Sequence, residues 1–96
     1  MGEDVQRLRE TTQPTLSDCA VGIGNIFERD LPDEHGVVAP RMSAVLVISD
    51  RKTGESRREK VFAGSVVSIG GDRYCVVSVE EGETSPGWVT VRKLRP

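Results

Sequence analysis

The stretch SVVSIGGDRYCVVSVEEG, residues 65–82, decides the fold class of this chain of 96 residues. Two runs rich in valine and isoleucine flank Gly70-Gly71. Because glycine readily adopts the positive φ angles of a tight two-residue turn, the stretch predicts an antiparallel hairpin. Side chains alternate between the two faces of a strand, which predicts the hairpin residues that face the core. They are Val67 and Ile69 on the first strand and Cys75, Val77 and Val79 on the second.

Further strands are predicted on both sides of this hairpin. They comprise residues 18–27, with a bend or bulge at Gly22 or Gly24, residues 43–50, residues 56–62, and residues 88–94, with Val89 and Val91 on the core side. Residues 28–36 have the acidic, proline-containing composition of a surface loop. The charged first half of residues 56–62 is typical of an edge strand, because charges discourage pairing with other chains. Short strands separated by frequent turns predict an all-β fold, a small antiparallel β-barrel or sandwich.

The chain is predicted to form one domain, because two cores within 96 residues would each be too small to offset the loss of chain entropy. Its first residues are polar, and Val5 and Leu8 are the only large apolar side chains before Leu16. Such a segment lacks the apolar stripe that holds a helix in water. We therefore expect a flexible N-terminal arm over residues 1–16 and a single β-barrel domain over residues 17–96.

The charge of the chain is small in total but unevenly distributed. The formal net charge is -2 and the pI is about 5.4, which argues against a general nucleic-acid-binding surface. Residues 1–42 hold four basic and eight acidic side chains, whereas residues 43–96 hold nine basic and seven acidic ones. Opposite charge on the two halves predicts that copies of the chain attract one another head to tail.

The two cysteines, Cys19 and Cys75, leave open whether a disulfide forms. In a chain without a signal peptide, two cysteines are more often free and buried. No apolar run approaches the roughly 20 residues that a membrane-spanning helix needs. From the residues alone we therefore expect a soluble, cytoplasmic product without a membrane partner.

The residues show no pattern that predicts catalysis, so we expect a protein that is not an enzyme and carries no cofactor. His35 is the one histidine, and it lies among carboxylates without a serine or cysteine at a suggestive spacing. The acidic residues around it do not match the calcium-loop pattern, which predicts a solvated turn and no metal site. Gly22-Ile23-Gly24 begins like a dinucleotide-binding fingerprint, but Phe27 stands where the third glycine is required.

A basic stripe is predicted if the strand of residues 56–62 lies near the last strand. Its members would be Arg57, Arg58, Lys60, Arg92, Lys93 and Arg95. The stripe lacks the aromatic residues on which single-stranded nucleic acid stacks. A solvated face, an acidic protein partner and a nucleic-acid backbone remain as its interpretations.

The order of these features resembles one protein family. Residues 63–77, AGSVVSIGGDRYCVV, follow an acidic loop and a long middle section, and they precede a second acidic loop and the closing strand GWVTV, residues 87–91. This order is similar to that of the head-tail joining proteins of long-tailed bacteriophages, the head completion or stopper proteins of the phage lambda type. In that family a glycine-turn hairpin and a final short strand recur within a small β-barrel that carries flexible arms. The resemblance covers residues 17–94, and Ser65 stands where the family has an acidic residue.

The resemblance implies an SH3-like barrel of the head-tail connector type and a structural role in the virion. A ring of roughly six or twelve copies would lie beneath a portal or adaptor protein, help to retain packaged DNA in its channel and offer an attachment surface to the tail. The predicted subunit interface joins Glu28, Asp30, Asp33 and Glu34 of one copy to Arg57, Arg58 and Lys60 of the next. The N-terminal arm would become ordered on a partner through Val5, Arg7, Leu8 and Arg9.

Two other functions remain open. One is a bacterial SH3-like interaction module that regulates or inhibits a single partner protein. The other is nucleic-acid binding through the basic stripe, which predicts binding that weakens steeply with salt.

Overall fold

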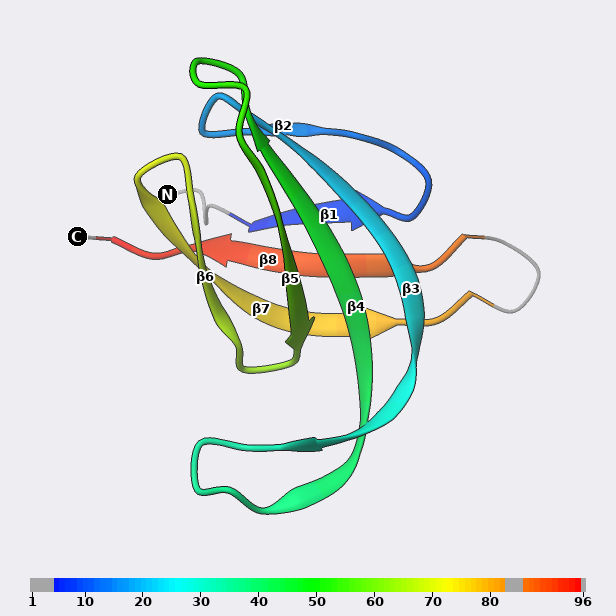
Figure 1. The fold of residues 1–96 in the computed structure, drawn as a ribbon. Helices are drawn as coiled ribbons and strands as arrows, with labels where there is room; N and C mark the ends of the chain where they lie inside the picture. The colour runs from blue at the N-terminus through cyan, green and yellow to red at the C-terminus, as the bar shows by residue number, and fades with distance from the viewer. Residues whose placement is uncertain (1–4, 83–85, 96) are drawn as a thin grey trace.

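The computed structural model describes residues 5–82 and 86–95. Within them the chain is all-β, as expected, with eight strands and no helix (Figure 1). The strands are β1 (Val5–Arg9), β2 (Thr15–Leu16), β3 (Cys19–Pro32), β4 (Val38–Asp50), β5 (Ser56–Phe62), β6 (Val66–Ile69), β7 (Asp72–Glu80) and β8 (Trp88–Lys93). The described residues thus include no helix of the length and apolar character that crossing a membrane requires.

The strands form two four-stranded antiparallel sheets, which corrects the prediction of a closed barrel. The first sheet has the order β1-β8-β7-β6 and the second the order β2-β3-β4-β5. In the second sheet the long strands β3 and β4 curl like half of a barrel (Figure 1). Two of the edge strands that would have to pair for closure are short, since β2 has two residues and β6 has four. Within the described residues the fold therefore keeps open seams, with β1, β2, β5 and β6 as edge strands.

The glycine hairpin predicted from residues 65–82 is confirmed as β6 and β7. Gly70 and Gly71 both have positive φ angles, 61° and 91°, and Ile69 pairs with Asp72 across the turn. This register determines which side chains of the hairpin face the core. They are Val67 and Ile69 on β6, and Tyr74 and Val76 on β7.

The predicted orientation of Cys75 and Val77 toward the core is wrong. Cys75 is only partly buried, and Val77 is 48% exposed. A bulge between Val76 and Ser78 adds one residue to β7, and beyond it Val79 packs against the core. The alternation inferred from sequence is therefore one residue out of phase before the bulge and correct after it.

The N-terminal segment belongs to the fold over its described residues, which corrects the prediction of a flexible arm. β1 pairs with β8 along its whole length, and β2 pairs with β3. Leu8 and Leu16 point into the core and are 1% and 2% exposed. Burial of these two leucines and the added ladder of hydrogen bonds offset the entropy lost when a polar segment becomes ordered. Residues 1–4 of the predicted arm lie outside the described residues.

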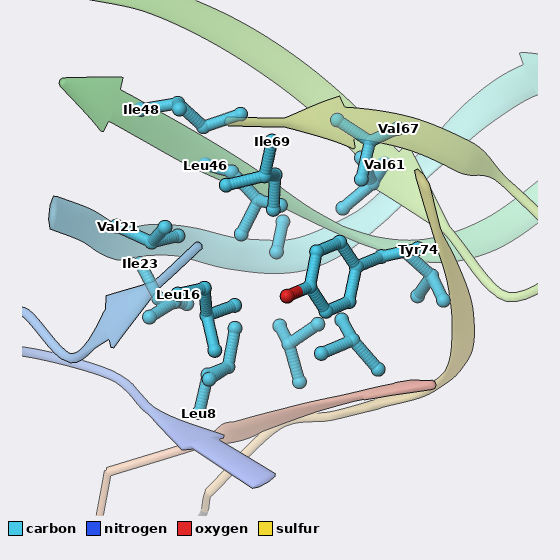
Figure 2. Close-up of a cluster of buried hydrophobic side chains, with 14 of the residues drawn as sticks. Leu8, Leu16, Val21, Ile23, Leu46, Ile48, Val61, Val67, Ile69 and Tyr74 are labelled. Atoms are coloured by element: carbon cyan, nitrogen blue, oxygen red, sulfur yellow. The ribbon is translucent and has the colours of Figure 1, made fainter. Parts of the chain in front are cut away.

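The core lies between the two sheets and consists mainly of aliphatic side chains (Figure 2). Val89 and Val91 are buried in it, as predicted for the last strand. Both cysteines are free, so the open question of a disulfide is resolved. Cys19 lies in the core, whereas Cys75 lies outside it.

Two tight turns pack against each other at one end of the molecule. The turn between β2 and β3 has positive φ angles at Ser17 and Asp18, 46° and 64°. A Cβ atom added to Gly70, in the turn between β6 and β7, would overlap the carbonyl oxygen of Ser17. The two sheets therefore approach each other closely at this end, where glycine is required for its small size as well as for its conformation.

Candidate protein-interaction site

β3 and β4 continue beyond the other strands of their sheet as a two-stranded ribbon. Their pairing runs from Phe27–Ser43 to Pro32–Val38, whereas β5 pairs with β4 only as far as Ser43. We call residues 27–43 the projecting hairpin, and it extends away from the two sheets at the bottom of Figure 1. The surface loop predicted over residues 28–36 is thus mostly strand. A two-stranded ribbon by itself is marginally stable in water, so contacts at its base and tip matter for its stability.

A bulge separates the projecting hairpin from the rest of β3. The register of β3 against β4 shifts between Gly24 and Phe27, and Asn25 has a positive φ of 52°. The predicted bulge is therefore present in β3, but it lies at Asn25 and Ile26 and not at Gly22 or Gly24. The Arg29 guanidinium donates hydrogen bonds to the Asn25 carbonyl, at 3.1 Å, and to the Ser43 hydroxyl. It also lies 3.5 Å from the centre of the Phe27 ring. Contacts at the base of the hairpin therefore fix its direction.

The tip of the projecting hairpin is held by Asp33 and Arg41. The Asp33 carboxylate accepts hydrogen bonds from the backbone N–H groups of Val37, at 3.0 Å, and His35, at 2.8 Å. These two hydrogen bonds, together with the charge of Arg41, lower the pKa of Asp33 below 3.8. Arg41 in turn donates to the Leu31 carbonyl at 3.0 Å. Asp33 therefore stabilises the hairpin rather than presenting its carboxylate to a partner.

The two faces of the projecting hairpin differ in exposure. Side chains that alternate with the register of β3 and β4 place Arg29, Leu31, Ala39 and Arg41 on one face, where all four are partly buried. The opposite face, which we call the open face, carries Glu28, Asp30, Pro32, Val38 and Pro40, and all five are exposed. Met42, which pairs with Glu28, lies on the same face at the base of the hairpin and is partly buried against the core. Val38 is the most exposed large hydrophobic residue among those described, at 62%. The open face therefore combines exposed apolar surface with two carboxylates.

The structure brings the four acidic residues predicted for the subunit interface onto this hairpin, but in three different settings. Glu28 and Asp30 lie on the open face. Glu34 is exposed at the tip, where its carboxylate lies 3.5 Å from the imidazole of His35. Asp33 is engaged inside the turn. Glu28 and Asp30 are thus the members of the set that are best placed to contact a partner.

The three basic residues predicted for the same interface lie on β5, which is an edge strand as its charged composition predicted. Arg58 pairs with Val47 and Lys60 with Val45, so both project from the outer face of the second sheet. Arg57 projects to the other side and donates a hydrogen bond to the Ser68 carbonyl of β6, across the open seam. The predicted basic stripe is therefore divided, because its remaining strand residues lie on β8 in the first sheet.

The residues predicted to bind a partner through the N-terminal segment lie on β1. Leu8 is buried and cannot contact a partner in this fold. The Arg7 guanidinium lies 4.3 Å from the centre of the Trp88 ring and 3.7 Å from the Glu80 carboxylate. Val5 and Arg9 are exposed. This set therefore contributes to strand pairing and core packing rather than to a mobile contact segment.

A hollow that the sequence analysis missed lies on the outer face of the second sheet. It has a volume of about 320 Å³, and Gly22, Gly24, Val45 and Val47 line it together with Arg58 and residues 11–13. We call it the glycine hollow. The sequence does contain a feature that indicates it. Two glycines at alternate positions of a strand leave one face of that strand without side chains, and this creates space there.

Comparison of the chain with protein-family models, with curated proteins and with solved structures gives no match. Among the described residues no group of three or more histidine, cysteine or acidic side chains is arranged to hold a metal ion. The exposed groups are carboxylates and valine on the projecting hairpin, and guanidinium and ammonium groups on β5. Such groups bind other proteins through ion pairs and apolar contact.

Proposed function

We propose that this chain is a structural assembly protein, a subunit of a head-tail connector ring of the joining, head completion or stopper type. The observation that carries the proposal is the presence of two complementary surfaces at different places on one molecule. The open face of the projecting hairpin is acidic and apolar, whereas the outer side of β5 presents Arg58 and Lys60.

Two different surfaces that fit each other form a heterologous interface, in which each copy uses one surface for each neighbour. Such contacts close into a ring when the rotation between copies permits it. The unequal charge of the two halves of the chain favours the same head-to-tail arrangement. Ion pairs mainly guide the encounter and the register of such a contact, while buried valine side chains add affinity.

In this proposal the ring lies in the virion beneath a portal or adaptor protein, and the tail attaches to its other side. The two packed sheets serve as a rigid body, and the projecting hairpin reaches the neighbouring protein. DNA would meet the ring only in its central channel. The connector-type, SH3-like character of the half-barrel belongs to this proposal, and the resemblance of the glycine hairpin supports it.

The proposal is tested by sedimentation velocity of the isolated chain at low ionic strength and the highest soluble concentration. We expect self-association that weakens as salt is added, because salt screens exposed ion pairs. The double variant R58E/K60E should remain folded by circular dichroism and lose self-association. The matched control R73E/R92E makes the same charge change at exposed positions of the first sheet and should associate like the wild type.

Other outcomes would contradict the ring. A chain that stays monomeric under all these conditions would do so, as would a two-fold symmetric dimer that R58E/K60E leaves intact. A one-to-one complex with a single partner protein, without self-association, would support the regulatory module instead. Binding to duplex DNA that weakens with salt and is lost in R58E/K60E would support the nucleic-acid interpretation.

A further inference from the structure

Gly22 and Gly24 occupy the middle of β3, although glycine weakens the interior of a strand. Neither has a positive φ, and the bulge that follows takes its positive φ at Asn25. A Cβ atom on Gly24 would meet no atom within 4 Å, and one on Gly22 would come no closer than 3.7 Å to the Gln13 side chain. Neither the backbone nor the packing of this chain therefore requires glycine at these positions.

Glycine within a strand also marks a place where another molecule approaches the backbone closely. Gly22 pairs with Val47 and Gly24 with Val45, so the two missing side chains lie in adjacent rows of the outer face. This leaves the backbone of β3 accessible beside two half-buried valines, at the floor of the glycine hollow. The floor is thus suited to an apolar side chain that reaches the surface of the sheet.

The rim of the glycine hollow is basic on the side of β5. Arg58 lines the hollow itself, and Lys60 lies in the next row, paired with Val45. An occupant that complements this surface has an apolar projection with carboxylates beside it. The open face of the projecting hairpin has this composition, with exposed Val38 on the same face as Glu28 and Asp30.

The projecting hairpin cannot reach the glycine hollow of its own chain. It is the direct continuation of β3 and β4, the two strands that form the floor. The contacts that Arg29 makes with Asn25 and Ser43 hold the base of the hairpin in place. Contact between the two surfaces therefore requires a second copy of the chain.

We infer that the glycine hollow is the docking site for the open face of the projecting hairpin of a second copy. Val38 of that copy covers the backbone at Gly24, and its Glu28 and Asp30 pair with Arg58 and Lys60. The inference rests on the self-association proposed above, and it identifies the receiving surface and the inserted residues.

The first test fills the hollow without changing any charge. Gly24→Val adds a side chain in open space at a position with ordinary backbone geometry, so the variant should fold like the wild type. Self-association measured by sedimentation should weaken about tenfold or more. Ser49→Val is the matched control, because Ser49 lies on the same strand and the same outer face as Val47 but outside the hollow. It should associate like the wild type, and Gly24→Ala serves as a smaller filling change if Gly24→Val unfolds.

The second test combines two defective variants. E28K/D30K has a disabled hairpin and an intact hollow, whereas Gly24→Val has an intact hairpin and a filled hollow. Each alone should associate about tenfold or more weakly than the wild type, and the mixing experiment is run at a concentration at which each alone is monomeric. A mixture of the two retains one compatible pair of surfaces and should give a one-to-one complex that does not grow further.

The outcomes separate this inference from the proposed function. If Gly24→Val and Gly24→Ala associate as strongly as the wild type while R58E/K60E does not, the hollow is not the receiving site and the ring proposal stands. A mixture that remains monomeric also overturns the docking arrangement. If the wild-type chain itself does not associate, that result contradicts the proposed ring, and the docking arrangement, which depends on the ring, is contradicted as well.

Discussion

The side-chain hydroxyl of Ser17 donates a hydrogen bond of 2.6 Å to the carboxylate of Asp72. Because the serine has a single proton to donate, its 2.7 Å contact with Tyr74 is a hydrogen bond donated by the tyrosine hydroxyl. The Lys93 ammonium group lies 3.4 Å from the same carboxylate. Ser17 belongs to the turn before β3, and Asp72 begins β7, so these contacts join the two sheets.

The stability of the fold should decline in acid partly through Asp72. The hydrogen bond from Ser17, followed by the charge of Lys93, lowers the pKa of Asp72 below 3.8 in the folded protein. The unfolded chain therefore takes up this proton at a higher pH than the folded chain does. The stabilisation is complete above pH 3.8 and is lost as the pH falls through the lowered pKa.

Urea unfolding midpoints measured across this pH range check the prediction. Ser17→Ala should lower the midpoint near neutral pH and reduce the decline in acid, because Asp72 loses its main partner. Part of the decline should persist in this variant, since the pKa of Asp33 is lowered as well. A decline in acid of the same size in both proteins would show that the Ser17–Asp72 hydrogen bond does not contribute to it.

Gly70→Ala should destabilise the protein more than Gly71→Ala. Both positions have positive φ, which an alanine adopts only with strain of about 1–3 kcal/mol. At Gly70 the added Cβ also overlaps the Ser17 carbonyl, whereas at Gly71 it meets no atom within 4 Å. Unfolding in urea should separate the two variants by at least about 1 kcal/mol. Equal losses would mean that the two turns do not pack as described.

Val76→Asp should unfold the chain, whereas Val77→Asp should be tolerated. The Val76 side chain is fully buried, and burying a carboxylate without a partner costs several kcal/mol, a large share of the stability of a small domain. Val77 sits in the bulge and is about half exposed, so its replacement should change stability by about 1 kcal/mol or less. Thermal melts of the two variants provide the comparison. If Val77→Asp had the lower melting temperature, Val77 and not Val76 would face the core, as the sequence predicted.

Leu8→Ala should lower the free energy of unfolding by about 2–5 kcal/mol, because it removes a buried side chain from the core. Gln6→Ala is the matched control, since Gln6 lies on the same strand and is exposed. It should change stability by less than about 0.5 kcal/mol. An unaltered urea midpoint in Leu8→Ala would mean that β1 is not packed against the core in solution.

The parts of the fold that follow from neighbouring residues were predictable from the sequence. Gly70-Gly71 between two valine-rich runs specifies the β6–β7 hairpin, and the charges of residues 56–62 indicate the edge position of β5. The orientation of β7 was not predictable, because it depends on the pairing of Ile69 with Asp72 and on a bulge that adds Val77. Neither feature has a signal in the alternation of apolar residues alone.

The features that depend on distant pairing were missed. β1 looks like a polar leader, and only its ladder with β8 makes Leu8 a core residue. The acidic, proline-containing segment after Phe27 looks like a loop, yet Arg29 and Arg41 make it a ribbon by binding carbonyl groups and covering one face. Of the candidate site, composition identified the acidic and basic sets, but the receiving role of Gly22 and Gly24 depends on the register of β3 with β4.

The pairing of Val5–Arg9 with Trp88–Lys93 also determines when the first sheet can be completed during synthesis of the chain. β1 can pair with its neighbour only after β8, far later in the sequence, has been translated. Until then Leu8 remains exposed to water on the nascent chain, and the first sheet lacks one edge. The first sheet is therefore completed late, and chaperones that bind short apolar segments have time to reach Leu8 before that happens.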